Sequence, residues 1–539
     1  MTEVPVRRAE VVAVVASCAA LSFAAVLWSW QHGAMLNYGD AVAHLAIARR
    51  VIDSHYPGLK QLGSVWLPLP HLLMIPFVAV YSWWARGIAG MIPSALAYIA
   101  GCVGLYRLTR QWLSTGAAMV ALTFFAINPN LLYLQTTAMT EPLFLCELIW
   151  TAVWLVDWRR TLDTDSHRSS RFLWFIALVL IAAVYTRYDG WILAFLAWTF
   201  IGITLLRHGQ LRSPAFWLAS ILVVAAPLVW FAYNATVFGD WLDFARGPYS
   251  ARAIEIRTAT PGSGPPHPGW HDPWISLLFF IRTAEIDTSA ELWGNRVLVL
   301  SAIGTVLACL TNRRRAFLWT LLLWLPVPFY AYSIAYGSVP IFIPKWWPHS
   351  WYNTRYGMEL LPAFALGLGF VAQFVLVAMQ EFKPRWTRYA AALLVALAVW
   401  NAWKVTAEKP LTYIEGTKNI DARRPLEQQI PPLLRAQLAI RPGGLVLMKT
   451  SVYPNLVAFT GIPLRQTINE GDGDLYAAAL AAPAAHAALV VAFDGDDIDQ
   501  AVKDHPAGLR ALGRYSTPGQ PTGTVYASDT PALNKAASR

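Results

Sequence analysis

Charged residues are scarce in this sequence. Only 14% of its 539 residues are Asp, Glu, Lys or Arg, and 56% are hydrophobic, whereas roughly a quarter of the residues are charged in an ordinary soluble domain. Apolar blocks long enough to cross a bilayer, roughly 20 residues each, recur between Val11 and Trp403. This composition excludes an ordinary soluble protein and predicts a membrane protein with many transmembrane helices.

Cysteines are also few. Cys18, Cys102, Cys146 and Cys309 all fall inside apolar blocks and lack the spacing of metal ligands, so we expect neither disulfides nor a zinc site. Internal repeats are absent. The net charge of +10 comes from basic residues dispersed in short loops, and membrane topology explains this pattern better than nucleic-acid binding does.

The basic loops predict the orientation of the chain. They are residues 157–171, 207–212, 313–315 and 383–388. By the positive-inside rule we place them in the cytoplasm, together with the N-terminus. The outer segments are then residues 31–65, the turn 187–191, the loops 234–291 and 333–356, and everything after residue 404.

Three apolar blocks, residues 68–84, 89–109 and 117–134, lie where this topology allows two crossings. The first block begins with Pro68 and Pro70, and proline breaks helices where a cavity can satisfy the freed backbone groups. We therefore expect the first block to re-enter or to lie flat. Counting the remaining blocks gives about eleven spans.

The composition changes near residue 405. Charged residues and prolines become frequent, and residues 444–450 and 487–493 have the pattern of short buried strands. The predicted fold is thus mainly α: a polytopic transmembrane domain, residues 1–404, followed by a soluble α/β domain outside the membrane, residues 405–539.

Two carboxylates near the outer boundaries are candidate catalytic groups. Asp40 begins a stretch with helical apolar spacing, and His44 lies one turn further on the same face. Glu141 lies between two apolar runs, where ionisable residues are costly and usually functional. The structural alternative for both is a capping or first-turn role, supported at Glu141 by the proline that follows it.

Further polar residues are candidates for substrate binding. Asp189 follows Arg187 closely, so the two side chains could simply pair with each other. In the aromatic-rich outer loop the candidates are Lys345, Tyr352, Arg355 and Tyr356, for which an interfacial belt with snorkelling cations is the alternative. A guanidinium at the position of Arg355 suits a lipid phosphate. His71 follows Pro70 and either fills the helix break or joins the binding site.

Three motifs resemble those of the GT-C superfamily of membrane glycosyltransferases, which includes protein O-mannosyltransferases and the lipid A aminoarabinose transferase. They are Gly39-Asp40 in the first outer loop, Thr140-Glu141-Pro142 about a hundred residues later, and Asn353-Thr354-Arg355-Tyr356 with Pro362. The mannosyltransferases have an Asp-Glu pair in the first loop, whereas Ala41 follows Asp40 here. A protein hydroxyl is therefore a less secure acceptor.

The resemblance implies an inverting glycosyltransferase of the bacterial inner membrane. Its donor would be a polyprenyl phosphate sugar, and its acceptor a hydroxyl of a glycan, lipid or protein on the outer face. Asp40 would be the general base, Arg355 and Lys345 would hold the leaving phosphate, and Glu141 would orient the acceptor or join Asp40 around magnesium or manganese. The alternative function is a transporter or a flippase for a lipid-linked glycan, although a transporter usually shows internal repeats.

Overall fold

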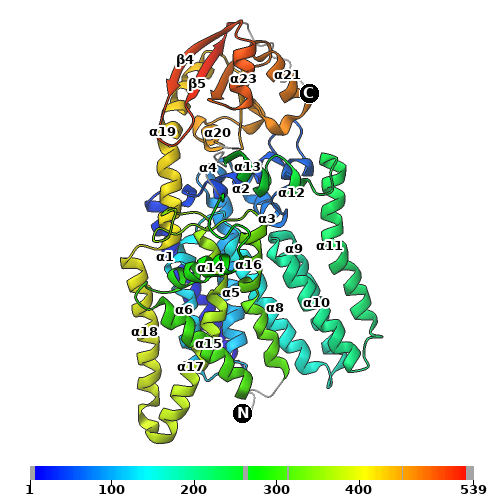
Figure 1. Ribbon diagram of the computed structural model, residues 1–539, viewed down its shortest axis with the longest axis vertical. Helices are drawn as coiled ribbons and strands as arrows, with labels where there is room; N and C mark the ends of the chain where they lie inside the picture. Colours follow the sequence, from blue (N-terminus) through cyan, green and yellow to red (C-terminus); the bar gives the residue numbers. More distant parts are fainter. Residues whose placement is uncertain (1–5, 259–264, 312–314, 452, 530–539) are drawn as a thin grey trace. The chain divides into compact units, whose positions relative to one another are not determined.

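The computed structural model describes residues 6–258, 265–311, 315–451 and 453–529, so Arg313 and Arg314 of the third basic loop lie outside the described residues. Helices dominate the chain (Figure 1). The first helices are α1 (Arg8–Gln31), α2 (Gly39–Arg50), α3 (Leu69–Val78), α4 (Tyr81–Ala85), α5 (Ile88–Thr109), α6 (Thr115–Ala126), α7 (Pro129–Leu134), α8 (Glu141–Thr161), α9 (Ser166–Thr186), α10 (Asp189–Arg207), α11 (Pro214–Phe238) and α12 (Asp243–Arg246).

The second half of the chain adds further helices and all the strands. The helices are α13 (Ala251–Thr258), α14 (Pro273–Thr288), α15 (Gly294–Thr311), α16 (Pro326–Tyr336), α17 (Leu361–Phe382), α18 (Thr387–Ala407), α19 (Leu411–Ala439), α20 (Asn455–Thr460), α21 (Asp474–Ala481), α22 (Pro483–His486) and α23 (Asp497–Asp504). This half also contains two 3-10 segments, η3 (Arg315–Trp324) and η4 (Thr354–Leu360). The strands are β1 (Val446–Met448), β2 (Thr467–Ile468), β3 (Leu489–Phe493), β4 (Leu509–Tyr515) and β5 (Gly523–Ser528).

The chain forms two compact units. The first unit comprises residues 1–31, 64–70 and 93–415, and the second comprises residues 32–63, 71–92 and 416–539. The second unit thus contains most of the predicted first outer segment as well as the tail. The expected division into residues 1–404 and 405–539 stays a prediction.

Nine helical segments in the described ranges are long and apolar enough to cross a membrane. The chain is an integral membrane protein. Helix α8 has 21 residues but is less apolar, and α6 has only 12; adding both gives the expected count of about eleven spans, which stays a prediction. The block at residues 68–84 is divided into α3 and α4, with Pro76 inside α3. The expectation that this block re-enters or lies flat stays a prediction.

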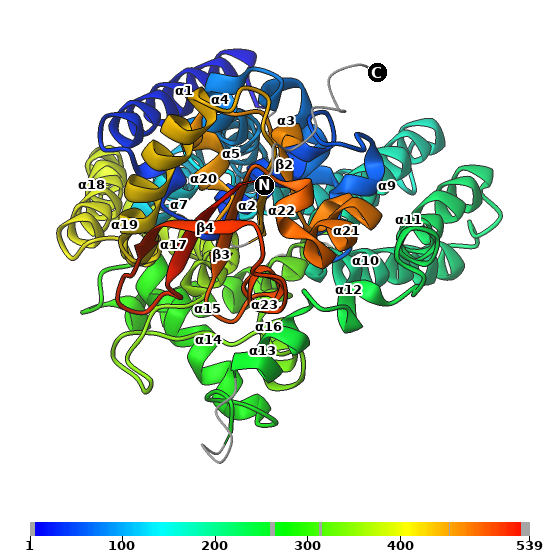
Figure 2. The ribbon, with the colours of Figure 1, turned by 90° about the horizontal axis from the view of Figure 1, so that it is seen from above.

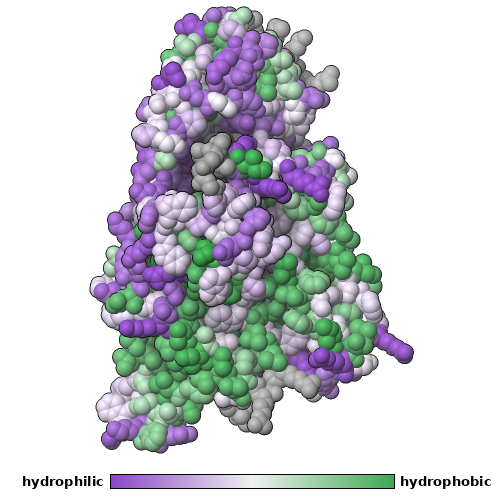
Figure 3. Space-filling model, viewed as in Figure 1, coloured by the Kyte–Doolittle hydropathy of each residue, from purple (hydrophilic) through white to green (hydrophobic). Residues whose placement is uncertain are grey.

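The first unit exposes apolar side chains on its outer helices. Helices α9, α10 and α11 run side by side (Figures 1 and 2). Along α11 the side chains of Trp217, Ile221 and Val229 are 54%, 64% and 57% exposed. Figure 3 shows hydrophobic residues gathered over α10 and α11, with hydrophilic residues near the helix ends. Because exposed hydrocarbon of this extent is unfavourable in water, we expect lipid to cover this surface.

The second unit contains a five-stranded mixed sheet in the order β2-β1-β3-β5-β4. Strand β1 pairs in parallel with β2 and β3, and β5 pairs antiparallel with β3 and β4. Helix α19 lies on one face of the sheet, while α21, α22 and α23 lie on the other (Figures 1 and 2). The two strands predicted from the sequence are β1 and β3, which confirms an α/β arrangement in the tail.

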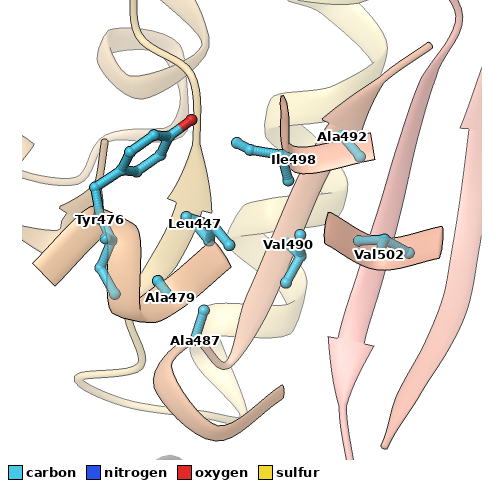
Figure 4. Packing of buried hydrophobic residues seen from close by; sticks show 9 residues of the cluster. Leu447, Tyr476, Ala479, Ala487, Val490, Ala492, Ile498 and Val502 are labelled. Carbon is cyan, nitrogen blue, oxygen red and sulfur yellow. The ribbon is translucent and has the colours of Figure 1, made fainter. Parts of the chain in front are cut away.

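Both faces of the central strands are buried. All five residues of β3 are inaccessible to solvent or nearly so. On one face Leu447 and Val490 pack against Ala479, Ile498 and Val502 from the covering helices (Figure 4). A strand that is buried on both faces needs a continuous apolar run, which explains why residues 487–493 were recognisable in the sequence.

Two glycines allow helices α15 and α17 to pack closely in the first unit. A Cβ at Gly304 would collide with the carbonyl oxygen of Gly367, and a Cβ at Gly367 would collide with the carbonyl oxygen of Ser301. Small residues let helix backbones approach in membranes, where packing and not the hydrophobic effect drives association. The contact therefore depends on the absence of side chains at these two positions.

We expect Gly304→Val to separate α15 from α17 and to lower the thermal unfolding temperature of the detergent-solubilised protein, because overpacking costs about 1–3 kcal/mol or more. The matched control is Gly202→Val in α10, where the nearest atom to a new Cβ would be 3.4 Å away. Fluorescence-detected size-exclusion chromatography after heating measures both variants. Equal stability of the two variants would contradict the proposed close packing.

Candidate functional site

Five segments of the first unit bring charged and polar side chains together. Glu141 begins α8, Asp189 begins α10, and Arg187 lies in the turn between α9 and α10. Arg355 and Glu359 belong to η4, Tyr330 to α16 and Glu415 to α19. We call these seven residues the Glu141 cluster. It contains four of the residues predicted from the sequence, Glu141, Arg187, Asp189 and Arg355.

Arg187 is the centre of the cluster. Its Nε donates to Asp189 Oδ2 at 3.1 Å, and its Nη1 donates to Glu141 Oε1 at 3.3 Å. Its Nη2 lies 2.8 Å from the Tyr330 hydroxyl and 3.1 Å from Glu359 Oε1. The side chain is only 14% exposed. The expected pairing of Asp189 with Arg187 is present, but it is one of several contacts that the guanidinium makes.

Arg355 connects Glu141 to Glu415. Its Nε donates to Glu141 Oε1 at 3.0 Å and its Nη1 to Glu415 Oε1 at 3.1 Å. Glu415 also accepts the backbone N–H groups of Asn353 and Thr354, each at 2.9 Å. The Arg355 side chain is 6% exposed. Two nitrogen atoms of the Arg355 guanidinium thus donate hydrogen bonds to carboxylates. The predicted contact with a lipid phosphate would have to use the other N–H groups of this guanidinium.

Local backbone features hold the two arginines in place. Asn353 adopts a left-handed conformation with φ of 54° just before η4, which turns its N–H and that of Thr354 toward Glu415. Gly190 packs so closely against the carbonyl oxygen of Ala183 that a Cβ cannot fit. Tyr356 stacks on Tyr330 at 5.1 Å and lies under both guanidinium groups, at 4.9 Å and 5.0 Å, so this predicted residue contacts the cluster through its ring.

The cluster contains more carboxyl groups than cations. Glu141, Asp189, Glu359 and Glu415 face two guanidinium groups, and Glu359 is wholly buried. Glu141 Oε2 is buried and has no hydrogen-bond partner among the described residues. Glu141 has one oxygen fixed by two arginines and a second oxygen available to a hydroxyl group.

Asp287 lies beside the cluster. It is wholly buried, and neither of its carboxyl oxygens has a hydrogen-bond partner in the described part of the chain. Its Oδ2 would lie 2.6 Å from a Cβ at Gly357, so only glycine fits there. The pKa of the Asp287 carboxyl is well above its usual range, because burial disfavours its charge and the Glu415 carboxylate repels it.

This shift makes folding stability depend on pH. An Asp in the unfolded chain has a pKa of about 3.9. Above that pH the unfolded chain loses a proton that the folded chain keeps. The free energy of unfolding therefore falls as the pH rises toward the raised pKa of Asp287 in the folded state. We expect Asp287→Asn to raise the unfolding temperature at pH 8 and to flatten its pH dependence. Asp421→Asn, at a side chain that is 53% exposed, is the control. Parallel pH profiles for wild type and Asp287→Asn would refute this account.

The second unit holds Asp40, His44 and His71. Helix α2 begins at Gly39, so Asp40 lies in its first turn and the N-cap is Tyr38. His44 is buried, and its Nδ1 lies 2.8 Å from Nε2 of His71. The Arg423 guanidinium donates to the carbonyl oxygens of Leu36 and Asn37 and interacts electrostatically with Asp40. Asp40 is partly accessible to solvent.

Two predicted residues of the first unit, Lys345 and Tyr352, lie outside the Glu141 cluster. Lys345 is 61% exposed, and its Nζ lies 2.5 Å from Glu291 Oε1. Tyr352 is 45% exposed and pairs with Phe342 through an isolated β-bridge. Proximity to Arg355 in the sequence does not bring them into the buried cluster, because the chain enters η4 only after Asn353 and leaves the preceding loop at the surface.

The predicted divalent cation has no support from this arrangement. In the described residues, no group of three or more His, Cys, Asp and Glu side chains is placed to hold a metal ion. One oxygen of Glu141 already accepts hydrogen bonds from two arginines, whose positive charges disfavour a bound cation. A magnesium or manganese site at Asp40 and Glu141 therefore stays a prediction.

No protein-family model and no curated protein matches this chain. Two crystal structures of ArnT from Cupriavidus metallidurans, one bound to undecaprenyl phosphate and one in the apo state, each align with a TM-score of 0.55. Their identity to this chain is 13% and 12%, and the alignments cover 94% and 95% of this chain and 97% and 98% of those chains. ArnT is the lipid A aminoarabinose transferase, a GT-C protein. This chain has a GT-C fold.

A third crystal structure also aligns with most of this chain. It is the Archaeoglobus fulgidus oligosaccharyltransferase in complex with Zn and sulfate, which aligns with a TM-score of 0.47 and 13% identity over 95% of this chain and 72% of that chain. The GT-C fold expected from the three motifs is therefore confirmed through ArnT.

Four buried residues of this region, Tyr330, Glu359, Glu415 and Asp287, were not predicted from the sequence. Glu359 had a signal that could have found it, since it stands at the start of an apolar block as Glu141 does. Glu415 lies in a polar stretch where carboxylates are common, and Tyr330 lies in an aromatic-rich block. Their roles depend on packing between helices that are far apart in the sequence.

We expect Arg187→Met to destabilise the GT-C fold by about 3–5 kcal/mol, because it leaves several buried carboxyl groups without their cation. The matched control is Arg168→Met, at a side chain that is 73% exposed and pairs with Asp165, where we expect a change within about 1 kcal/mol. Thermal unfolding in detergent compares them. An unchanged unfolding temperature for Arg187→Met would show that the cluster does not stabilise the fold.

Proposed function

We propose that this protein is a membrane glycosyltransferase that moves a sugar from a polyprenyl phosphate-linked donor to an acceptor hydroxyl. The observation that carries the proposal is the end-to-end similarity of its fold to ArnT, whose crystal structure is bound to undecaprenyl phosphate. The buried, carboxylate-rich Glu141 cluster supports it, because polar groups of this kind in a membrane protein are costly and are usually functional. We place the protein in a bacterial inner membrane with its tail on the extracytoplasmic face.

Asp40 is the proposed general base. Its carboxylate is partly accessible, and it interacts electrostatically with the Arg423 guanidinium. Glu141 is less suited to accept a proton, since two guanidinium groups bind one of its oxygens and its side chain is 1% exposed. We assign Glu141 to orienting the acceptor hydroxyl through its second oxygen, and His44 and His71 to positioning substrate near α2.

The proposed reaction inverts the anomeric carbon. The acceptor hydroxyl gives its proton to Asp40 while its oxygen forms a bond to the anomeric carbon, and the bond from that carbon to the phosphate oxygen breaks on the opposite face. The products are the glycosylated acceptor and polyprenyl phosphate. We assign stabilisation of the phosphate charge to Arg355 and Lys345; Lys345 is the accessible one, although it must exchange its contact with Glu291.

Asp40→Asn tests the proposal. We expect the variant to lose about 10²- to 10⁴-fold in transfer rate, as removal of a general base does, while it still binds polyprenyl phosphate because the side-chain shape is kept. The measurement is transfer of radiolabelled sugar from a panel of polyprenyl phosphate sugars by purified protein in membranes, with release of polyprenyl phosphate as a second readout.

Asp421→Asn is the matched control, since it makes the same change at an exposed site in the same unit. Full activity of Asp40→Asn would rule out Asp40 as the base. Lipid phosphate binding without transfer from any donor, by the wild type, would contradict the transferase and favour a flippase or transporter.

A further inference from the structure

His44 and His71 form a buried pair in the second unit. The Nδ1 atom of His44 lies 2.8 Å from the Nε2 atom of His71, and the ring centroids are 4.9 Å apart. At this distance the two nitrogens share a hydrogen bond, in which one imidazole donates and the other accepts. The two residues are 4% and 0% exposed. Because neither ring is open to a substrate, an effect of the pair on the reaction must act through the helices that carry it.

The pair is one of two contacts between the segments of α2 and α3. His44 lies in the second turn of α2, and His71 lies in the first turn of α3. The other contact lies near the far ends of the two helices, where Arg49 donates to the carbonyl oxygens of Val78 and Ala79 at 2.6 Å and 3.1 Å. The pair is thus the contact that lies nearer to the start of α2.

These contacts restrain α2 in different ways. Arg423 of α19 binds the carbonyl oxygens of Leu36 and Asn37, just before the helix, and Arg49 binds near its end. Contacts at the two ends fix the axis of a helix but leave it free to rotate about that axis. The contact made by His44 lies between the ends and away from the axis, so it opposes this rotation.

The rotation of α2 determines the direction in which the Asp40 carboxylate points. Asp40 precedes His44 by four residues, which places the two side chains on one face of the helix, about 40° apart. A carboxylate about 5 Å from the helix axis moves by about 1 Å when the helix turns by about 12°. A misplacement of about 1 Å can lower the rate of a reaction about 10²-fold.

We propose that the His44–His71 hydrogen bond fixes the rotation of α2 and thereby the direction of the Asp40 carboxylate. The proposal rests on the glycosyltransferase function proposed above and specifies how the two histidines act in it. They are positioning residues that act through α2, and they do not touch the substrate.

The bond depends on the protonation state of both rings. A neutral imidazole has one N–H group and one acceptor nitrogen, so two neutral rings, or one neutral and one charged ring, can share the bond. Two imidazolium rings have no acceptor left, and their charges repel each other. Because an imidazole gains its second proton in mildly acidic solution, the bond breaks as the pH falls. Activity that depends on the bond is therefore lost on the acid side.

Few other charged groups surround the pair. The segments η1 (Ala34–Leu36), η2 (Leu59–Leu62) and α4 pack against α2, and they contain one charged residue, the exposed Lys60. Helix α3 contains none. The other charged residues lie on α2, follow it or bind the backbone before it; they are Asp40, Arg49, Arg50, Asp53 and Arg423. All of these stay in place when His71 is changed, so a pH effect that depends on His71 reports on the pair.

The test is the rate of sugar transfer by the full-length protein in nanodiscs, from about pH 5 to about pH 8, with the donor panel described above. We expect His71→Ala to lower kcat about 10- to 100-fold and to change KM for the donor less than about threefold. His71→Gln should restore most of this loss, because its amide group can both donate and accept near the position of Nε2. It should also keep its activity at about pH 5, where we expect the wild type to lose about tenfold.

His505→Gln is the matched control, since it makes the same change at an exposed histidine of the same unit. It should follow the wild type at every pH. Equal losses of kcat in His71→Ala and His71→Gln would show that His71 only fills space, and would overturn the proposal. A change confined to KM would overturn it as well, because it would indicate a direct contact with substrate.

The unfolding temperature over the same pH range provides a readout that does not depend on transfer. We expect it to fall on the acid side more steeply for the wild type than for His71→Gln. That difference, without transfer from any donor by the wild type, would refute the transferase and leave the bond between α2 and α3 standing. Transfer by the wild type, with the same pH profile in His71→Gln, would refute the role of the histidine pair alone.

Discussion

The guanidinium of Arg187 is the group on which the first unit most depends. It contacts residues of α8, α10, α16 and η4, and it lies at the end of α9. In a membrane protein no lipid can solvate such a cation, so the protein must supply all of its acceptors. The helices that carry these acceptors must therefore keep a fixed register relative to one another, within about the tolerance of a hydrogen bond, a few tenths of an ångström.

The contacts of Arg187 distinguish two kinds of carboxylate in this protein. Glu141, Asp189 and Glu359 share Arg187, and their burial makes them structural as well as chemical groups. Asp40 begins α2 in the other unit and is partly accessible. A group that must gain and lose a proton in each turnover cannot also be the counter-charge on which the fold depends. For this reason we propose Asp40 and not Glu141 as the base, although both looked alike in the sequence.

The sequence was sufficient for the elements with a periodic or continuous pattern. The transmembrane helices, the helix that begins near Asp40 and the strands β1 and β3 were all predicted, since each depends on a local apolar pattern. Glu141 was found because a charge next to apolar residues is unusual. Glu415 and Tyr330 could not be found, because their partners Thr354, Arg355 and Glu359 lie 29 to 61 residues away. Lys345 was grouped with Arg355 because the two are close in the sequence; Lys345 is 61% exposed, whereas Arg355 is buried in the Glu141 cluster.

In the second unit, contacts at both ends of α2 fix the position of Asp40, the proposed base. Arg49 near the end of α2 donates to the carbonyl oxygens of Val78 and Ala79, and Asp53 accepts the backbone N–H of Leu464 in the tail. At the other end of α2, Arg423 of α19 binds the backbone just before Asp40. Helix α2 is thus attached to the tail at both ends, which are about 18 Å apart for a helix of 12 residues. A base at the start of α2 would therefore keep a fixed position within the second unit, which limits the directions from which an acceptor hydroxyl can reach it.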